Sequence, residues 1–325
     1  MGKSFLCLAA LYLGTSAATV LAFDRDGDGI EDELEQALLE RFHPRFFIDE
    51  RECAGRPAEF VPFSHEPRAG ERNGTIYAGA SPSDALGPNQ IAVELHYYHL
   101  WDVDCGRLNG HELDVEHVSA LVTAASREAN ASEWRARYWY AAAHEGTICD
   151  ASNAARAAAL DAVESGPTVW ISRAKHASFL SEDLCRQRGC GGDACGQMVP
   201  LPTGSPINVG EAGAPLGGAL WIDSSLWPLR EKLDTDFDRE LLDRLDTGED
   251  AIVARVHGHW RPAQFSLSVG GDALGALDSA GDGGGGAVEE ADEQVRSALG
   301  KTLRAIGRAF EWLVKPMSAA GSDEP

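Results

Sequence analysis

Short apolar or aromatic runs, separated by clusters of Gly, Pro, Asn and Asp, make up the chain from Phe46 to about Val269. Runs rich in β-branched and aromatic residues are typical of β-strands, and the clusters between them are typical of turns. We expect strands at residues 45–49, 91–101, 115–123, 134–142, 168–172, 251–257 and 260–269, and a short helix at 156–164. Many strands with few helices predict a mainly β fold, a two-sheet β-sandwich over residues 45–270.

Two further helices are expected outside the sandwich. Residues 32–42 place Leu34, Leu38 and Phe42 at helical spacing and stop before Pro44. After a Gly-rich linker at 271–287, apolar residues recur with a period near 3.6 from 288 to 315, which predicts one amphipathic helix. Its apolar face leaves two alternatives open: contact with the sandwich or another subunit, or binding to a membrane surface.

Residues 1–22 have the pattern of a signal peptide. Lys3 gives a basic start, an apolar centre rich in Leu and Ala follows, and Val20-Leu21-Ala22 ends the segment with compact residues. This apolar run is too short to predict a membrane span, and no later stretch reaches the necessary length. The mature chain is therefore expected to be secreted or periplasmic.

Residues 23–44 begin with a complete twelve-residue loop of the calcium-binding type. Acidic side chains occupy loop positions one, three, five, nine and twelve, a glycine makes the bend at six, and a backbone carbonyl serves at seven. The ligands expected are Asp24, Asp26, Asp28, Ile30, Asp32 and Glu35. No helix enters the loop, so it resembles the half EF-hands of extracellular modules such as dockerin. The alternative is an exposed acidic turn.

The charge balance limits the kinds of partner that the protein can bind, and the cysteines indicate the compartment in which it folds. With 51 acidic and 28 basic residues the formal net charge is -23, which argues against nucleic acid as a partner and suits cations. Six cysteines follow residue 22, an even number that predicts disulfides outside the cell. A zinc knuckle of Cys185, Cys190, Cys195 and His176 is the alternative, and spacing does not determine the pairing.

The segment GHELDVEHV, residues 110–118, concentrates histidines and carboxylates in front of an apolar run. In a strand, Asp114 and Glu116 share one face about 7 Å apart, and His117 faces the opposite side. His111 can lean over the two carboxylates from the preceding turn, which is a donor set for a divalent cation. Calcium or magnesium is favoured over zinc because oxygens outnumber nitrogens. A solvated edge strand is the alternative.

This segment resembles the H-x-x-D-W-E core of the necrosis- and ethylene-inducing-like secreted proteins and of the family named after vacuolar protein sorting protein sixty-two. Two positions depart from it, because Leu113 replaces a histidine of the first family and Val115 replaces the tryptophan. The matching residues are Gly110, His111, Asp114, Glu116, His117 and Val118. Similarity to the second family extends to His43-Pro44-Arg45-Phe46-Phe47, Leu95-His96-Tyr97-Tyr98 and Ser172-Arg173-Ala174-Lys175-His176-Ala177-Ser178.

The resemblance implies a β-sandwich. Two classes of function remain open, and the resemblance implies the first of them. In the first, a cation held by His111, Asp114 and Glu116 orients a lipid headgroup or a glycan, as in a cytolysin. The second is a metal-dependent hydrolase of esters or phosphoesters, in which His117 or His176 moves the proton. His144 and His176 lie where the second family places histidines near its core strand.

Overall fold

The computed structural model describes residues 23–263, except 107–109, 148, 188–192, 212, 227–228, 230–231, 233 and 257. The expected signal peptide, Gly-rich linker and C-terminal amphipathic helix lie outside these residues, and so does the end of the last expected strand. Their partners, including a membrane surface or another subunit, therefore stay predictions.

The larger of two sheets has eight strands in the order β10-β2-β3-β4-β5-β6-β13-β14. β10 pairs with β2 in parallel, and the other neighbours are antiparallel. The strands are β2 (Ile76–Ser83), β3 (Ile91–Asp104), β4 (His111–Ala124), β5 (Arg135–Ala141), β6 (Asn153–Arg156), β10 (Ile207–Asn208), β13 (Ile252–Val256) and β14 (His259–Pro262). The solvated-edge alternative for residues 110–118 fits only the first part of the segment. Glu112 is exposed and pairs with β3 alone, whereas residues 115–118 are buried and Val118 pairs with both β3 and β5.

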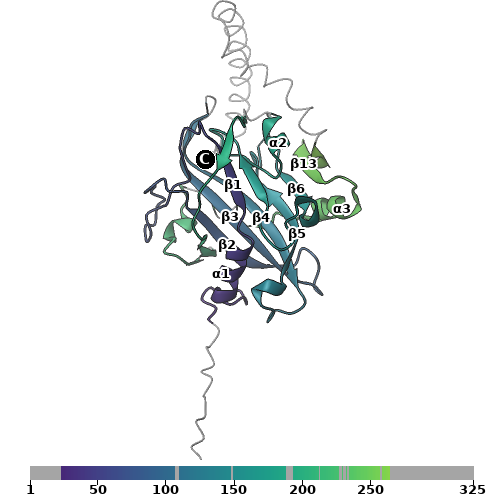
Figure 1. The fold of residues 1–325 in the computed structure, drawn as a ribbon. Coiled ribbons are helices and arrows are strands. Elements are labelled where there is room, and N and C mark those ends of the chain that lie inside the picture. Colours follow the sequence, from purple (N-terminus) through teal and green to yellow (C-terminus); the bar gives the residue numbers. More distant parts are fainter. Residues whose placement is uncertain are drawn as a thin grey trace, which may run out of the picture.

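The smaller sheet has four strands in the order β8-β7-β1-β9, with β1 parallel to β7. They are β1 (Arg45–Asp49), β7 (Thr168–Ile171), β8 (Ser178–Phe179) and β9 (Met198–Pro200), and a short pair is formed by β11 (Gly210–Glu211) and β12 (Ala214–Pro215). Figure 1 shows β1 crossing in front of β3 and β4. Two mixed sheets packed together confirm the predicted β-sandwich.

The core between the sheets consists of alternate residues of each strand. Phe46 and Ile48 of β1 face Tyr97 and Trp101 of β3, and all four are buried. Helix α1 (Asp32–Arg41) adds Leu38 and Leu39 to the same core, which confirms the expected helix with an end one residue earlier. Burying each of these side chains contributes about 1.5–3 kcal/mol.

The opposite face of the large sheet is also covered. The 3₁₀ helix η3 (Leu220–Asp223) packs Trp221 against Tyr77 and Tyr98, and α3 (Arg239–Thr247) packs Leu241 against Tyr140. Because both faces are covered, the middle of β3 and β4 is buried on each side. Polar groups at these positions therefore need partners.

The expected helix at 156–164 is wrong apart from one 3₁₀ turn, η2 (Ala157–Leu160). Arg156, the first residue of the expected helix, is still in β6 and pairs with Tyr138 of β5, and Asp161 ends the turn in the left-handed region with φ of 52°. Elements that the sequence pattern did not predict are β2, β6, β8–β12, η1 (Ala131–Glu133), η3, α2 (Glu182–Arg186) and α3.

Disulfides join Cys53 to Cys105 and Cys185 to Cys195, and Cys149 is disulfide-bonded as well. These bridges indicate an oxidising, extracellular environment. They also exclude the zinc knuckle, because bridged cysteines do not bind metal as thiolates.

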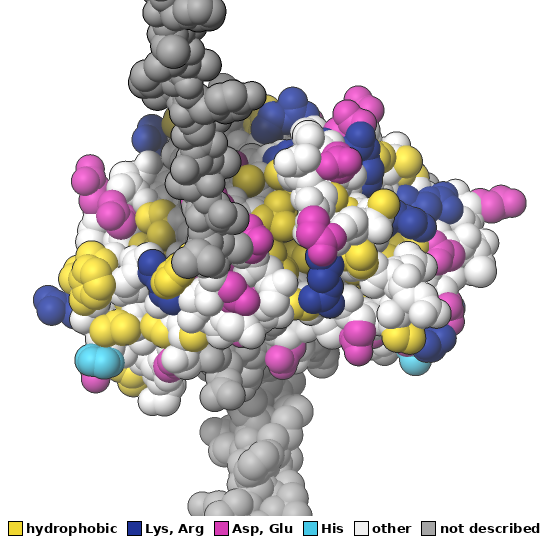
Figure 2. Space-filling view, turned by 90° about the horizontal axis from the view of Figure 1, so that it is seen from below, with side chains coloured by type: hydrophobic (Ala, Val, Ile, Leu, Met, Phe, Trp, Pro, Cys, Tyr) yellow, Lys and Arg dark blue, Asp and Glu magenta, His cyan; other side chains and the backbone are white. Residues whose placement is uncertain are grey.

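Two properties of the described residues bear on partners. On the face shown in Figure 2, acidic and basic side chains are interspersed, with hydrophobic side chains between them. None of the described helices has both the length and the apolar character needed to cross a membrane.

The two bridges are expected to differ in their contribution to stability. Cys53–Cys105 closes 52 residues and Cys185–Cys195 closes 10. By loop-closure entropy, replacing the first pair with Ser should lower the free energy of unfolding by about 4 kcal/mol and replacing the second by about 3 kcal/mol. Urea unfolding of the two double variants measures both, and the reverse order would contradict the loop-closure explanation.

Candidate functional site

The site lies at one end of the sandwich, where β3, β4 and two loops meet. Cross-strand pairing sets Trp101 opposite Asp114 and His99 opposite Glu116. Asp114 and Glu116 face the smaller sheet, whereas His117 points to the opposite face and hydrogen-bonds Asp236. The expected alternation of side chains along β4 is therefore present.

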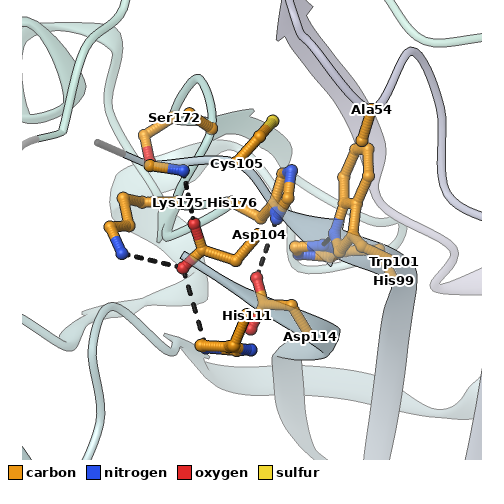
Figure 3. A network of polar contacts seen from close by, with 12 residues as sticks. Ala54, His99, Trp101, Asp104, Cys105, His111, Asp114, Ser172, Lys175 and His176 are labelled. Carbon is orange, nitrogen blue, oxygen red and sulfur yellow. Dashed lines mark hydrogen bonds and ion pairs between the residues drawn. The ribbon is translucent and has the colours of Figure 1, made fainter. Parts of the chain in front are cut away.

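His176 is the central residue of the site and comes from the turn between β7 and β8. Its Nδ1 lies 2.7 Å from Oδ2 of Asp114, and its Nε2 lies 3.3 Å from Oε1 of Glu52. The imidazole stacks on the indole of Trp101, with ring centroids 3.8 Å apart and planes 7° apart. We call these four side chains the His176 network, and Figure 3 shows Asp114 pointing at His176 within it.

The two carboxylates hold His176 in its charged form. Burial alone lowers the pKa of an imidazole, but the hydrogen bonds and charges of Asp114 and Glu52 outweigh it and raise the pKa of His176 to about 9. Burial raises the pKa of each carboxyl, but the hydrogen bond to His176 and the charge of its ring, with smaller contributions from neighbouring groups, outweigh burial and lower the pKa of both Asp114 and Glu52. The network is a buried ion cluster in which each charge has a partner.

A second pair repeats this arrangement. Nε2 of His144 lies 2.9 Å from Oδ2 of Asp193, whose Oδ1 accepts a 2.7 Å hydrogen bond from Ser172. Burial lowers the pKa of His144, but the charge of Asp193, its hydrogen bond to the ring and the charge of Glu116 together outweigh burial and raise the pKa to about 9. His144 and His176 are therefore imidazolium ions at neutral pH.

Asp104, at the end of β3, forms the outer part of the site. Its Oδ2 lies 2.8 Å from Nζ of Lys175 and 3.7 Å from Nε2 of His111, and both side chains reach it in Figure 3. The His111 side chain is 55% exposed, whereas that of Asp114 is 12% exposed. The site therefore opens to solvent beside His111.

Glu116 lies deeper and is less well satisfied. Its Oε2 is buried and has no hydrogen-bond partner. Burial raises the pKa of Glu116, and the charge of Lys232 lowers it in part. An unbonded buried carboxylate oxygen next to Asp114 can accept a proton or a cation.

Backbone strain concentrates around the site. Leu113 (φ 59°), His144 (φ 55°), Ala174 (φ 71°) and His176 (φ 54°) are non-glycine residues in the left-handed region. This conformation costs about 1–3 kcal/mol per residue and persists where the surroundings impose it, often at functional sites. Leu113 is a bulky residue in this region, at the position where the necrosis-inducing family has its second histidine.

The structure brings together some of the predicted residues and separates others. His176 contacts Asp114, but His111 contacts Asp104 instead. His111, Asp114 and Glu116 are not among the groups of described side chains whose ligand atoms lie within 4.8 Å of one another. His117, the other proton-transfer candidate, lies on the far side of the sheet from the site.

Several residues of the site were missed from sequence. Glu52 and Asp104 each precede a cysteine of one disulfide, which fixes them near His176. The cysteine pairing would have been the signal, but spacing does not reveal it. Asp193 comes from a loop in which no sequence pattern indicates a role.

The N-terminal loop forms a separate acidic site. Ligand atoms of Asp26, Asp28 and Glu35 lie within 4.8 Å of one another, as do those of Asp24, Asp26 and Asp32. Gly29, with φ of 92°, makes the bend, and the backbone N–H groups of Gly27 and Gly29 both donate to Asp24. Such a left-handed φ favours glycine.

Four carboxylate oxygens in this loop are buried without a hydrogen bond: Asp26 Oδ1 and Oδ2, Asp28 Oδ2 and Glu35 Oε1. Burial is the largest cause that raises the pKa of Glu35 to about 8 and that of Asp28 to about 6. Neighbouring carboxylates raise both further. The donor set, which consists of oxygens only, is suited to a hard cation.

None of the protein-family models, curated proteins or solved structures compared with this chain matches it.

The imidazolium state of His176 predicts a pH dependence of stability. Its folded pKa of about 9 exceeds the ordinary 6.5, so the stabilisation is fully present below pH 6.5 and is lost as the pH rises through 9. The free energy of unfolding of the wild type should fall by on the order of 2–3 kcal/mol more than that of His176→Gln between pH 6 and 10. Urea unfolding across this range measures the difference.

His259→Gln is the matched control, because the His259 side chain is 66% exposed. Its pH curve should run parallel to that of the wild type. Parallel curves for wild type and His176→Gln as well would show that His176 is neutral in the folded protein.

Proposed function

We propose that residues 24–35 bind one calcium ion. The side-chain ligands would come from Asp24, Asp26, Asp28, Asp32 and Glu35, and the carbonyl of Ile30 would complete the set. The observation that carries this proposal is the convergence of four buried carboxylate oxygens that lack hydrogen bonds. A divalent cation compensates their mutual repulsion and their loss of hydration, which nothing else in the loop does.

The calcium ion would hold the N-terminal segment on the sandwich. Helix α1 follows the loop directly and inserts Leu38 and Leu39 into the core. Asn208 of β10 donates a 2.7 Å hydrogen bond to Oε2 of Glu35, so the loop also contacts the edge of the large sheet. Because removal of the expected signal peptide would leave only Phe23 ahead of the loop, we expect the weak affinity of extracellular calcium modules.

Calorimetry should therefore detect one calcium ion bound with a Kd of roughly 10⁻⁴–10⁻³ M. Asp26→Asn and Glu35→Gln should abolish the binding, because each removes a ligand charge. Calcium at a hundred times the Kd should raise the free energy of unfolding of the wild type by about 2.7 kcal/mol relative to the calcium-free protein. The free energies of unfolding of the two variants should not change.

Glu33→Gln provides the control, since it removes the same charge from loop position ten, which supplies no ligand. It should bind calcium like the wild type. If Glu33→Gln and Glu35→Gln lost calcium binding equally, the effect would be one of net charge and not of ligand identity. Unaltered calcium binding in Glu35→Gln would refute the site.

We further propose that the site around His176 recognises a polar lipid headgroup or a glycan through a bound calcium or magnesium ion. Asp114 and Glu116 would hold this cation from the inner side. His111 would approach from the open side, because its exposed ring can turn from Asp104 toward Asp114, whose pKa its charge already lowers. The strained backbone around the site and the resemblance to the necrosis-inducing family support this cytolysin-like function.

The protonation states favour binding over hydrolysis of an ester or phosphoester. A hydrolase needs a group that accepts a proton near neutral pH. His176 is already protonated, with a pKa of about 9, and His117 lies across the sheet. Of the two residues predicted to move a proton, His176 therefore acts as a fixed charge and His117 lies outside the site, which supports recognition over hydrolysis.

Dye release from lipid vesicles and binding to a glycan array should separate these functions from hydrolysis of an ester and phosphoester panel. We expect cation-dependent binding or dye release that Asp114→Asn and Glu116→Gln reduce at least tenfold, which is about 1.4 kcal/mol. Circular dichroism checks that both variants are folded.

Glu112→Gln is the matched control, because Glu112 is an exposed residue of the same strand. It should bind like the wild type. Cation-dependent turnover of an ester without any binding activity would favour the hydrolase instead.

A further inference from the structure

A second cluster of metal-binding side chains lies on the opposite face of the large sheet. Ligand atoms of His96 on β3, His117 on β4 and Asp236 lie within 4.8 Å of one another. The three side chains are 3%, 0% and 6% exposed. We call them the His96 cluster.

Strands β3 and β4 and the segment that carries Asp236 set the geometry of the His96 cluster. Tyr98 pairs with His117 and His96 pairs with Ser119, so the two histidines lie diagonally on one face. Nε2 of His117 lies 2.9 Å from Oδ2 of Asp236, and Nδ1 of His96 lies 3.6 Å from the same oxygen. One small cation could contact all three groups after minor adjustments.

Neighbouring side chains orient the cluster. Glu94 accepts 2.7 Å hydrogen bonds from the backbone N–H of Asp236 and from the hydroxyl of Thr235, which fixes the segment that carries Asp236. Oε1 of Glu94 also lies 3.4 Å from Nε2 of His96, the nitrogen that faces away from Asp236. Ser119 donates a hydrogen bond to Asp236. A carboxylate behind a histidine is the usual outer partner of a metal ligand.

The ring nitrogens of His96 provide an independent observation. Both are buried, and neither makes a hydrogen bond of regular geometry; Nε2 has Glu94 at 3.4 Å, whereas Nδ1 has no group nearer than Asp236 at 3.6 Å among its ion-pair partners. Buried polar nitrogens without hydrogen bonds are rare, and in this cluster one of them faces a carboxylate and a second imidazole. A metal ion between the three groups would give Nδ1 of His96 the partner that it lacks.

We infer that His96, His117 and Asp236 form a site for a divalent transition metal of the zinc class. Two imidazole nitrogens and one carboxylate suit zinc, whereas calcium prefers the oxygen ligands of the N-terminal loop. Three protein side chains leave the fourth position of a tetrahedral ion to a water molecule or to the second oxygen of Asp236. The burial of all three side chains gives the ion a structural role. It fixes the residues before α3 to the centre of the sheet.

The test is zinc titration of the metal-stripped full chain, produced without a histidine tag, against a chromophoric chelator in excess calcium. We expect one zinc ion per chain. Asp236→Asn and His117→Ala should each weaken binding more than tenfold, and Glu94→Gln should weaken it 10–100-fold through the orientation of His96. His259→Ala, which removes an exposed histidine, should have no effect.

Cobalt provides a readout that does not depend on variants. Cobalt in a four-coordinate site with two nitrogens absorbs strongly in the visible range, whereas six-coordinate cobalt absorbs weakly. A weak spectrum for the wild type, zinc binding that excess calcium displaces, or binding lost in Asp114→Asn but kept in Asp236→Asn would overturn the proposal. The last outcome would assign the zinc to the site around His176.

Discussion

Charge that is buried inside a protein has to be paired, and this constraint governs what packs on the central strands. β3 and β4 carry ionisable side chains on both faces, and both faces are covered. Asp114 is stable in its place only because the turn after β7 brings His176 to it. On the other side, His117 requires Asp236 from the segment before α3. The covering layers are thus positioned by ionic partners as well as by apolar area.

The sequence pattern predicted the parts of the fold that depend on local information. β1 was found with its correct limits, because Pro44 and an acidic turn bound its apolar run, and the helix after the acidic loop was found from its spacing. Strands β2 and β6 were missed, because their Ala- and Gly-containing segments become strands only by pairing with neighbours. Sheet formation there is a tertiary effect that no local pattern contains.

The candidate site likewise has one part that the sequence could predict and one part that it could not. The alternation along β4 predicted which side chains share a face, since it needs only the two-residue period of a strand. The partners of those side chains come from distant loops, so Glu52, Asp104 and Asp193 could not be located from spacing. His111 was expected over Asp114, but Asp104 attracts it, and that carboxylate reaches it only because the long hairpin of β3 and β4 closes on itself.

The disulfide between Cys53 and Cys105 also positions ionic groups of the candidate site. Glu52 and Asp104 directly precede the two cysteines, so one covalent bond ties the carboxylate that contacts His176 to the one that contacts Lys175 and His111. Before oxidation the first of these residues sits on a loop with no such tether. Reduction would release Glu52 from this tether, so the bridge helps to assemble the ionic partners of His176 as well as bracing the fold.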